Sequence, residues 1–238
     1  MAQGKRLRAQ GIVPTAAQQT VSLDKVRHRH RRQPLRPRWI FLLSFSVPVL
    51  ILALAYAVQG FHPVGDFMGR LLGNDWRSTT PLTIDLYHQY APFLAELKGK
   101  LEAGESLFYS WNGGLGMNFW ALIAYYAASP LNLILLIFPY DYLTEAITVM
   151  TLIKVGLTGL GMAALLRNGF SPNGVRQVAD DEPGAVSYTS QTASDWAIIL
   201  VSAALALNGW MLAYSWDIRW RDAVAFLPWI VLGLIRLV

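Results

Sequence analysis

Asp85 and Asp66 are the acidic side chains best placed to act as a general base. They lie in the motifs TIDLYHQY and PVGD, within a polar stretch between two long apolar runs. Gln89 follows Asp85 by four residues, so the two side chains would share one face of a helix. A carboxylate in this setting can accept a proton from an attacking hydroxyl group. The alternative is that Asp85 caps a helix starting at Leu86.

The segment WNGGLGMN at 111–118 is a second candidate for chemistry. Its three glycines free the backbone to present N–H groups to an anion. The spacing matches neither the Walker loop nor the dinucleotide-binding fingerprint, and a tight turn is the alternative explanation. Trp111 could stack on a sugar ring or anchor the chain at a membrane interface.

Charged residues also occur inside or beside apolar runs, where they are costly. Lys154 interrupts the apolar run 144–166, where an isolated lysine costs about 3 kcal/mol on insertion scales. It is therefore expected to face a cavity, an acid or an anionic ligand, with snorkelling as the alternative. A short charged segment further on could pair internally or line the same site; it contains Asp217, Arg219, Arg221 and Asp222.

Composition places these residues in a membrane protein. The chain has 238 residues, of which 54% are hydrophobic and 15% charged, with a mean hydropathy of +0.34. Soluble domains carry about a quarter charged residues. The absence of cysteine excludes disulfides, cysteine nucleophiles and Cys-based metal sites. The sequence contains no recognisable metal-binding motif, so it does not identify a cofactor. Binding of a divalent cation stays an open alternative.

A basic arm at residues 1–38 orients the chain. It holds ten of the twenty Lys and Arg residues against one acid, Asp24. Such an excess before a first span predicts a cytoplasmic N-terminus and contact with anionic lipid headgroups. No aromatic residues interleave these charges before Trp39, so nucleic acid is not an expected partner.

Apolar runs predict an all-α, multi-pass protein of the cell (cytoplasmic) membrane. Residues 39–59 form an uncharged run of the length needed to cross the hydrocarbon layer. Gly156, Gly159 and Gly161 in the next clear span would allow close helix contact. The expected order is span 39–59, extracytoplasmic loop 60–143 with short helices, span 144–166, cytoplasmic linker 167–195, span 196–214, outer hairpin 215–222, and the start of a further span at 223–238.

The segment 117–139 leaves the topology open. It is uncharged, but its centre reads AASPLN, which predicts two short helices meeting at a bend. We expect a re-entrant or interfacial pair; if it crosses instead, every later segment changes side. The last apolar run is shorter than a full span, so the chain is expected to be truncated.

Several of these stretches resemble the bacterial YfhO family of multi-pass membrane proteins. The similar segments are PVGD at 63–66, TIDLYHQYAPF at 83–93, residues 104–139, IKVGLTGL at 153–160, and residues 207–237. The resemblance implies the N-terminal part of a glycosyltransferase of the GT-C type, with a GT-C-like transmembrane helix bundle. It also implies a polyprenyl-phosphate-linked sugar as donor and an envelope polymer, such as lipoteichoic or wall teichoic acid, as acceptor.

The implied reaction suggests a role for each candidate residue. Asp85, or Asp66 as second choice, would activate the acceptor, and Lys154, Arg219, Arg221 or the glycine-rich turn would stabilise the leaving phosphate. Gln89, Trp111, Asn112 and Asn118 would contact the sugar, and Asp217 and Asp222 would line the site. Two other classes of function remain open: a transporter or flippase-like protein, with Lys154 on the substrate path, and a non-catalytic membrane scaffold.

Overall fold

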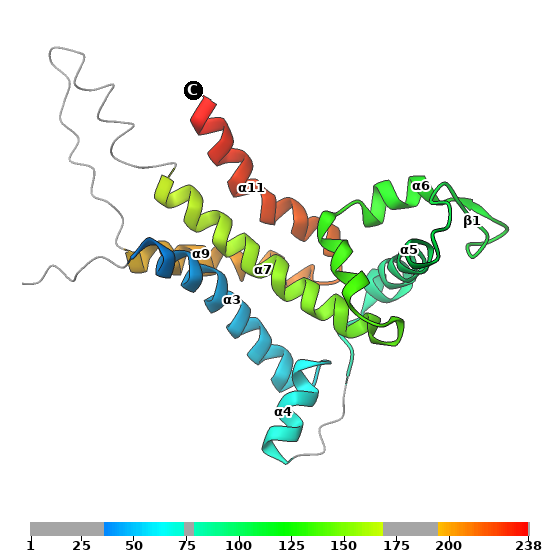
Figure 1. The fold of residues 1–238 in the computed structure, drawn as a ribbon. Helices are drawn as coiled ribbons and strands as arrows, with labels where there is room; N and C mark the ends of the chain where they lie inside the picture. Colours follow the sequence, from blue (N-terminus) through cyan, green and yellow to red (C-terminus); the bar gives the residue numbers. More distant parts are fainter. Residues whose placement is uncertain (1–35, 74–78, 169–194, 238) are drawn as a thin grey trace, which may run out of the picture. The chain divides into compact units, whose positions relative to one another are not determined.

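The computed structural model describes residues 36–73, 79–168 and 195–237, and the fold is that of an all-α membrane protein in these ranges (Figure 1). Three helical stretches among them are long and apolar enough to cross a membrane: Pro37–Gln59, Tyr140–Asn168 and Asp195–Ala213. Most of the basic arm 1–38 and of the linker 167–195 lies outside the described residues.

Helix α7 (Leu143–Asn168) is the centre of the helix bundle. It packs against α3 (Pro37–Gln59), α9 (Asp195–Ala206) and α11 (Ile218–Leu237). The close contact expected at its glycines is confirmed. A Cβ atom would lie 2.5 Å from the Phe45 ring at Gly156, 2.2 Å from the Ser44 carbonyl oxygen at Gly159, and 2.6 Å from Trp229 at Gly161.

The hairpin expected at 215–222 is mostly helix in the structure. Helix α11 begins at Ile218, so Arg219, Arg221 and Asp222 belong to its first turns. Asp222 bonds to Lys154 of α7 and Arg219 to the Tyr125 carbonyl, contacts that sequence alone does not show. With these charges near its start and Arg236 near its end, α11 is not among the three apolar stretches above.

The stretch 117–139 folds as two helical pieces, as its Pro-containing centre predicts. Phe119–Ala127 comprises α6 (Phe119–Leu122) and the π-helical turn η2 (Ile123–Ala127), and it meets the 3-10 helix η3 (Pro130–Ile137) at an angle of 99°. Length and composition fit either a broken span or a re-entrant loop. A short 3-10 turn, η4 (Tyr140–Tyr142), then leads into α7.

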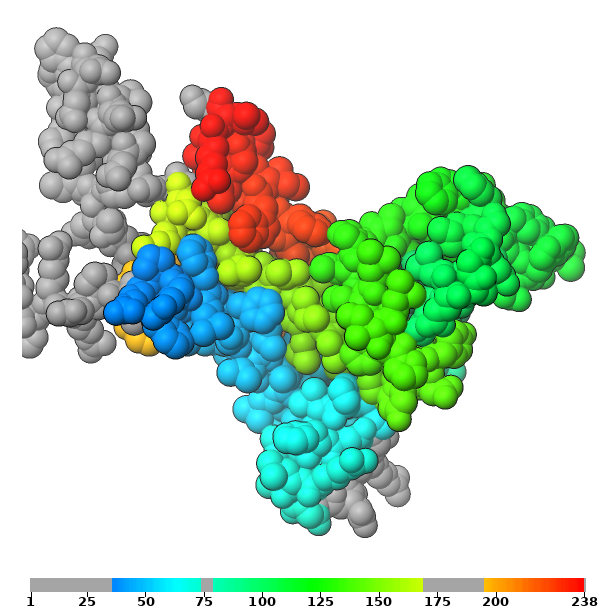
Figure 2. Space-filling view, viewed as in Figure 1, coloured from blue at the N-terminus to red at the C-terminus, as the bar shows by residue number. Residues whose placement is uncertain are grey.

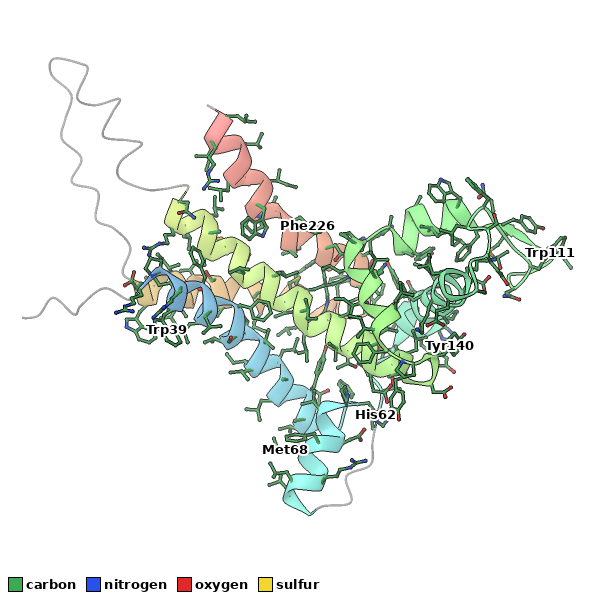
Figure 3. All side chains as sticks on the ribbon, viewed as in Figure 1. Trp39, His62, Met68, Trp111, Tyr140 and Phe226 are labelled. Carbon is green, nitrogen blue, oxygen red and sulfur yellow. The ribbon has the colours of Figure 1, made fainter. Side chains whose placement is uncertain are left out.

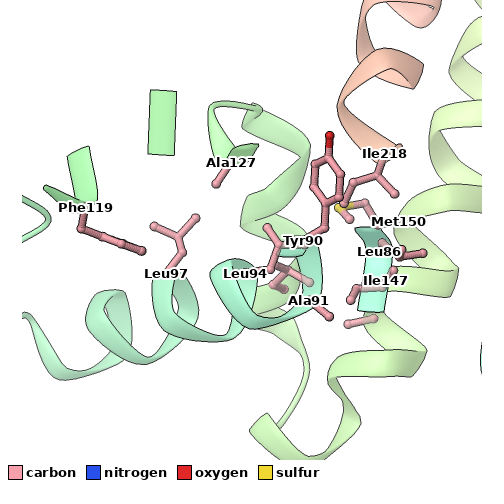
Figure 4. Packing of buried hydrophobic residues seen from close by; sticks show 12 residues of the cluster. Leu86, Tyr90, Ala91, Leu94, Leu97, Phe119, Ala127, Ile147, Met150 and Ile218 are labelled. Atoms are coloured by element: carbon pink, nitrogen blue, oxygen red, sulfur yellow. The ribbon is translucent and has the colours of Figure 1, made fainter. Parts of the chain in front are cut away.

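A second group of elements contains helix α5 (Ala91–Ala103), which contacts α7, and a two-stranded sheet that contacts α6. It also contains the π-helical turn η1 (Leu86–Tyr90), and the strands of the sheet are the antiparallel β1 (Tyr109–Ser110) and β2 (Met117–Asn118). Their apolar core joins α5 to Ile147 and Met150 of α7 and to Ile218 of α11 (Figure 4). Pro92 occupies the first turn of α5, where its missing N–H costs no helical hydrogen bond.

Two further short helices complete the described chain. Helix α4 (Val64–Leu72) turns back at the end of α3, and a Cβ atom on Gly65 would lie 2.3 Å from the Gly60 carbonyl carbon (Figure 2, cyan). Helix α10 (Gly209–Ala213) continues α9 after a break, where the Asn208 side chain accepts a hydrogen bond from the Met211 amide at 2.9 Å.

Candidate functional site

Asp85 stands directly before η1, after a strained residue. Ile84 has a φ of +48°, a left-handed conformation that β-branched residues rarely adopt. Such strain is typical of functional sites. The Asp85 carboxylate makes no capping hydrogen bond, so the capping alternative is not realised. Its Oδ1 atom instead accepts a hydrogen bond of 3.2 Å from Nε2 of Gln89, which confirms the shared helical face.

Gln89 links Asp85 to a tyrosine far along the chain. The Tyr126 hydroxyl, in the π-helical turn η2, donates a 2.5 Å hydrogen bond to Oε1 of Gln89. Both η1 and η2 are π-helical, and such turns are often found at functional sites because they re-aim side chains. A continuous path of hydrogen bonds therefore runs from Tyr126 through Gln89 to Asp85.

Tyr90 makes a parallel connection to the start of α11. Its hydroxyl donates a 2.5 Å hydrogen bond to Oδ1 of Asp217, and both residues are buried. Burial and the hydrogen bond to Asp217 raise the pKa of Tyr90 well above its usual value, so the phenol remains a donor at neutral pH. Its ring lies edge-on to that of Tyr126, with 5.2 Å between the centroids.

Arg219 contributes a positive charge beside these tyrosines. Its Nη1 atom donates a 3.0 Å hydrogen bond to the carbonyl of Tyr125, and its guanidinium lies 4.3 Å from the centre of the Tyr125 ring. Arg219 is half-buried and Tyr125 is exposed. We refer to seven residues of η1, η2 and the start of α11 as the tyrosine–carboxylate cluster: Asp85, Gln89, Tyr90, Tyr125, Tyr126, Asp217 and Arg219.

Lys154 faces an acid, which is one of the outcomes expected from its position. Its Nζ atom lies 2.9 Å from Oδ2 of Asp222 and 3.1 Å from the carbonyl oxygen of Ile218. The lysine side chain is only 1% exposed. In this conformation Lys154 ties α7 to α11 and has no surface for a ligand arriving from outside.

Arg221 is buried as deeply as Lys154. It is 1% exposed, and its Nη2 atom donates a 3.3 Å hydrogen bond to the carbonyl of Met211. Its Nε and Nη1 atoms have no hydrogen-bond partner among the described residues, and neither does Oδ1 of Asp222. Of the cations Lys154, Arg219 and Arg221, Arg219 is therefore the one accessible to a ligand.

The three candidate sugar contacts at 111–118 lie away from the tyrosine–carboxylate hydrogen bonds. Nδ2 of Asn112 donates to Glu96 at 2.7 Å, and Oδ1 of Asn118 accepts from the Ala121 amide at 3.2 Å. Trp111 is 77% exposed beside the strands (Figure 3). Hydrogen bonds from Ser110 and Asn112 lower the pKa of Glu96, outweighing the rise that burial alone would cause. The side chains of Asn112 and Asn118 are thus already hydrogen-bonded to other groups of the protein.

The glycine-rich segment forms a tight turn between β1 and β2. The Gly116 amide donates a 3.0 Å hydrogen bond to the Gly113 carbonyl. Gly114 and Gly116 have φ values of +58° and +104°, which side chains rarely allow. Of the two explanations given by the sequence, the structure shows the tight turn.

Asp66 lies on α4 and pairs with a histidine. Its Oδ2 atom is 2.5 Å from Nδ1 of His62, and both side chains are about one-third exposed. Across residues 36–73, 79–168 and 195–237, no group of three or more His, Asp or Glu side chains could hold a metal ion.

Tyr90, Tyr125 and Tyr126 were not among the residues selected from the sequence. Exposed Tyr125 gave no signal, whereas for Tyr90 and Tyr126 the available signal was the hydroxyl group, because tyrosines that are buried generally need hydrogen-bond partners. Their partners Asp217 and Gln89 lie in other segments, so spacing along the chain does not identify them.

Comparison with known proteins identifies the family. The family described as bacterial membrane protein YfhO matches residues 44–178, which is more than half of the chain. The match begins within α3 and includes Asp66, the η1 and η2 parts of the tyrosine–carboxylate cluster, and Lys154; the similar segment at 207–237 lies beyond it. No curated protein and no solved structure matches. The chain belongs to the YfhO family of bacterial membrane proteins.

Proposed function

We propose that the chain forms part of a membrane glycosyltransferase of the GT-C type. The donor is a polyprenyl-phosphate-linked sugar, and the acceptor is a polymer of the cell envelope, such as lipoteichoic or wall teichoic acid, on the outer face of the membrane. Membership of the YfhO family supports the class of protein. The observation that carries the proposal is the partly exposed Asp85 carboxylate, held by Gln89 within a hydrogen-bonded cluster.

In this reaction Asp85 is the general base. The acceptor hydroxyl gives its proton to the Asp85 carboxylate as its oxygen bonds to the anomeric carbon of the sugar, and the bond from that carbon to the lipid phosphate breaks. The phosphate leaves with the electron pair and needs positive charge beside it. Among the candidate cations Arg219 is assigned this role, because Lys154 and Arg221 are each 1% exposed.

The other candidate residues differ in how well they fit a role in this reaction. Gln89 orients the base, and exposed Trp111 remains a surface on which a sugar ring could stack. Asn112 and Asn118 are less suited to contact sugar because their amides already have partners. A transporter is supported less well than an enzyme, since Lys154 is buried against Asp222 rather than lining an open path.

Replacing Asp85 by asparagine tests the proposal. Asparagine keeps the size of the side chain and an oxygen that can accept from Gln89, but it removes the basic carboxylate. Loss of a general base costs about 10²- to 10⁴-fold in rate. Membranes that contain the full-length protein with this change and are supplied with lipid-linked sugar should therefore incorporate sugar into envelope polymer at most about one-hundredth as fast as membranes with the unchanged protein.

The matched control is Asp141→Asn in η4, which changes an exposed acid outside the cluster. It should incorporate sugar at the normal rate and reach the same level in the membrane. Normal incorporation by Asp85→Asn, with equal insertion, would remove Asp85 as the base and leave Asp66 as the next residue to test.

A further inference from the structure

We propose that Tyr126 positions the general base by holding in place the Gln89 side chain, whose amide donates a hydrogen bond to Asp85. This inference rests on the proposed function, in which Asp85 removes a proton from the acceptor. Tyr126 does not bond to Asp85; its hydroxyl bonds to Oε1 of Gln89, whose Nε2 bonds to Asp85. It is a positioning residue rather than a catalytic one.

The argument starts from the two unlike ends of an amide side chain. The Gln89 oxygen accepts hydrogen bonds and its nitrogen donates them. The Asp85 carboxylate only accepts hydrogen bonds, so the amide nitrogen faces it, 3.2 Å away, and Oε1 is left to accept from the Tyr126 hydroxyl at 2.5 Å. With the amide turned the other way, its oxygen would face the Asp85 carboxylate, and two acceptors would oppose each other.

The Tyr126 hydroxyl can hold the Gln89 side chain in place because the Tyr126 ring is itself packed on several sides. The ring lies 5.2 Å from that of Tyr90, 4.9 Å from that of Phe93 and 4.7 Å from that of Tyr125, measured between centroids. These contacts come from η1, α5 and η2, so the direction of the hydroxyl is set by tertiary packing. A Tyr126→Phe change keeps the ring and removes only the hydrogen bond.

Without the hydroxyl, the Gln89 side chain loses its contact at Oε1 and samples other rotamers, so its hydrogen bond to Asp85 is made less often and the Asp85 carboxylate samples more orientations. Only the chemical step depends on that orientation. Tyr126→Phe should therefore lower kcat about 3- to 10-fold, the usual effect of one hydrogen bond, and leave KM for the donor and the acceptor unchanged. A purely structural defect would instead reduce the amount of inserted protein or change both KM values.

The test is a set of variants in which Tyr126→Phe is combined with a change at Gln89. Gln89→Met keeps the length of the side chain and removes both hydrogen bonds. If Tyr126 acts through Gln89, the double variant is no slower than Gln89→Met alone, with rates normalised to inserted protein. Losses that multiply in the double variant would overturn the proposal, as would an unchanged kcat in Tyr126→Phe.

Two matched Tyr→Phe changes complete the design. Tyr142→Phe removes a hydroxyl from an exposed residue outside the cluster and should leave kcat unchanged. Tyr90→Phe removes a hydroxyl that bonds to Asp217, so its effect should multiply with that of Gln89→Met. The result for Asp85→Asn separates the two proposals: full activity there contradicts the proposed function, whereas an inactive Asp85→Asn beside a normal Tyr126→Phe contradicts only the positioning role.

Discussion

Replacing Lys154 by methionine should destabilise the protein strongly, because Lys154 holds a buried acid. The Nζ atom bonds to Asp222 Oδ2 at 2.9 Å and to the Ile218 carbonyl at 3.1 Å, and the other oxygen of Asp222 already lacks a partner among the described residues. Lys154 is 1% exposed and Asp222 14% exposed, so water can replace little of the hydrogen bonding that Asp222 and the Ile218 carbonyl lose when the lysine is removed. Breaking a buried pair by removing one partner typically costs about 3–5 kcal/mol.

The double variant Lys154→Met with Asp222→Leu should recover part of that loss. It removes both charges and leaves apolar side chains of similar size between α7 and α11, an exchange that is often neutral or stabilising. We expect a coupling energy of about 2 kcal/mol or more between the two sites, in the upper part of the range for residues in contact.

The measurement is unfolding of the purified protein in detergent, followed by the loss of helical circular dichroism as denaturant increases. Arg236→Met is the matched control: like Lys154→Met it replaces a positive charge by methionine, but at an exposed position on α11, and it should change the free energy of unfolding by less than about 0.5 kcal/mol. Additive effects of the two substitutions, or a Lys154→Met variant as stable as the control, would show that the Lys154–Asp222 contact does not hold α7 against α11.

Two further outcomes are expected. Gly159→Ala would place a Cβ atom 2.2 Å from the Ser44 carbonyl oxygen, a backbone atom that cannot turn aside, and should lower the free energy of unfolding by about 1–3 kcal/mol. Gly233→Ala, with open space around its Cβ position, should be neutral in the same assay. In the cysteine-free chain, Leu115→Cys at a 97% exposed position should react with an impermeant maleimide in intact cells, and Gln18→Cys only after permeabilisation. The reverse pattern of labelling would contradict the cytoplasmic assignment of the N-terminus.

Much of the candidate site could be anticipated where neighbours in space are also neighbours in sequence. Asp85 and Gln89 are four residues apart and do share a helical face, and the glycines of α7 do mark close helix contacts. The partners of Asp217 and Arg219 could not be anticipated in this way. They bond to Tyr90 and to the Tyr125 carbonyl, which lie far away in the sequence.

The sequence by itself determined that this is a helical membrane protein and where its three apolar stretches lie, because crossing the hydrocarbon layer depends mainly on the length and hydropathy of a local segment. Only the tertiary structure decided which charged groups are accessible. Lys154 and Arg221 lie 1% exposed between packed helices, whereas Arg219, two residues from Arg221, is half-buried against an exposed tyrosine. The physical reason is that burial and hydrogen-bond partners depend on which segments pack together, and that packing is set by contacts distant in the chain.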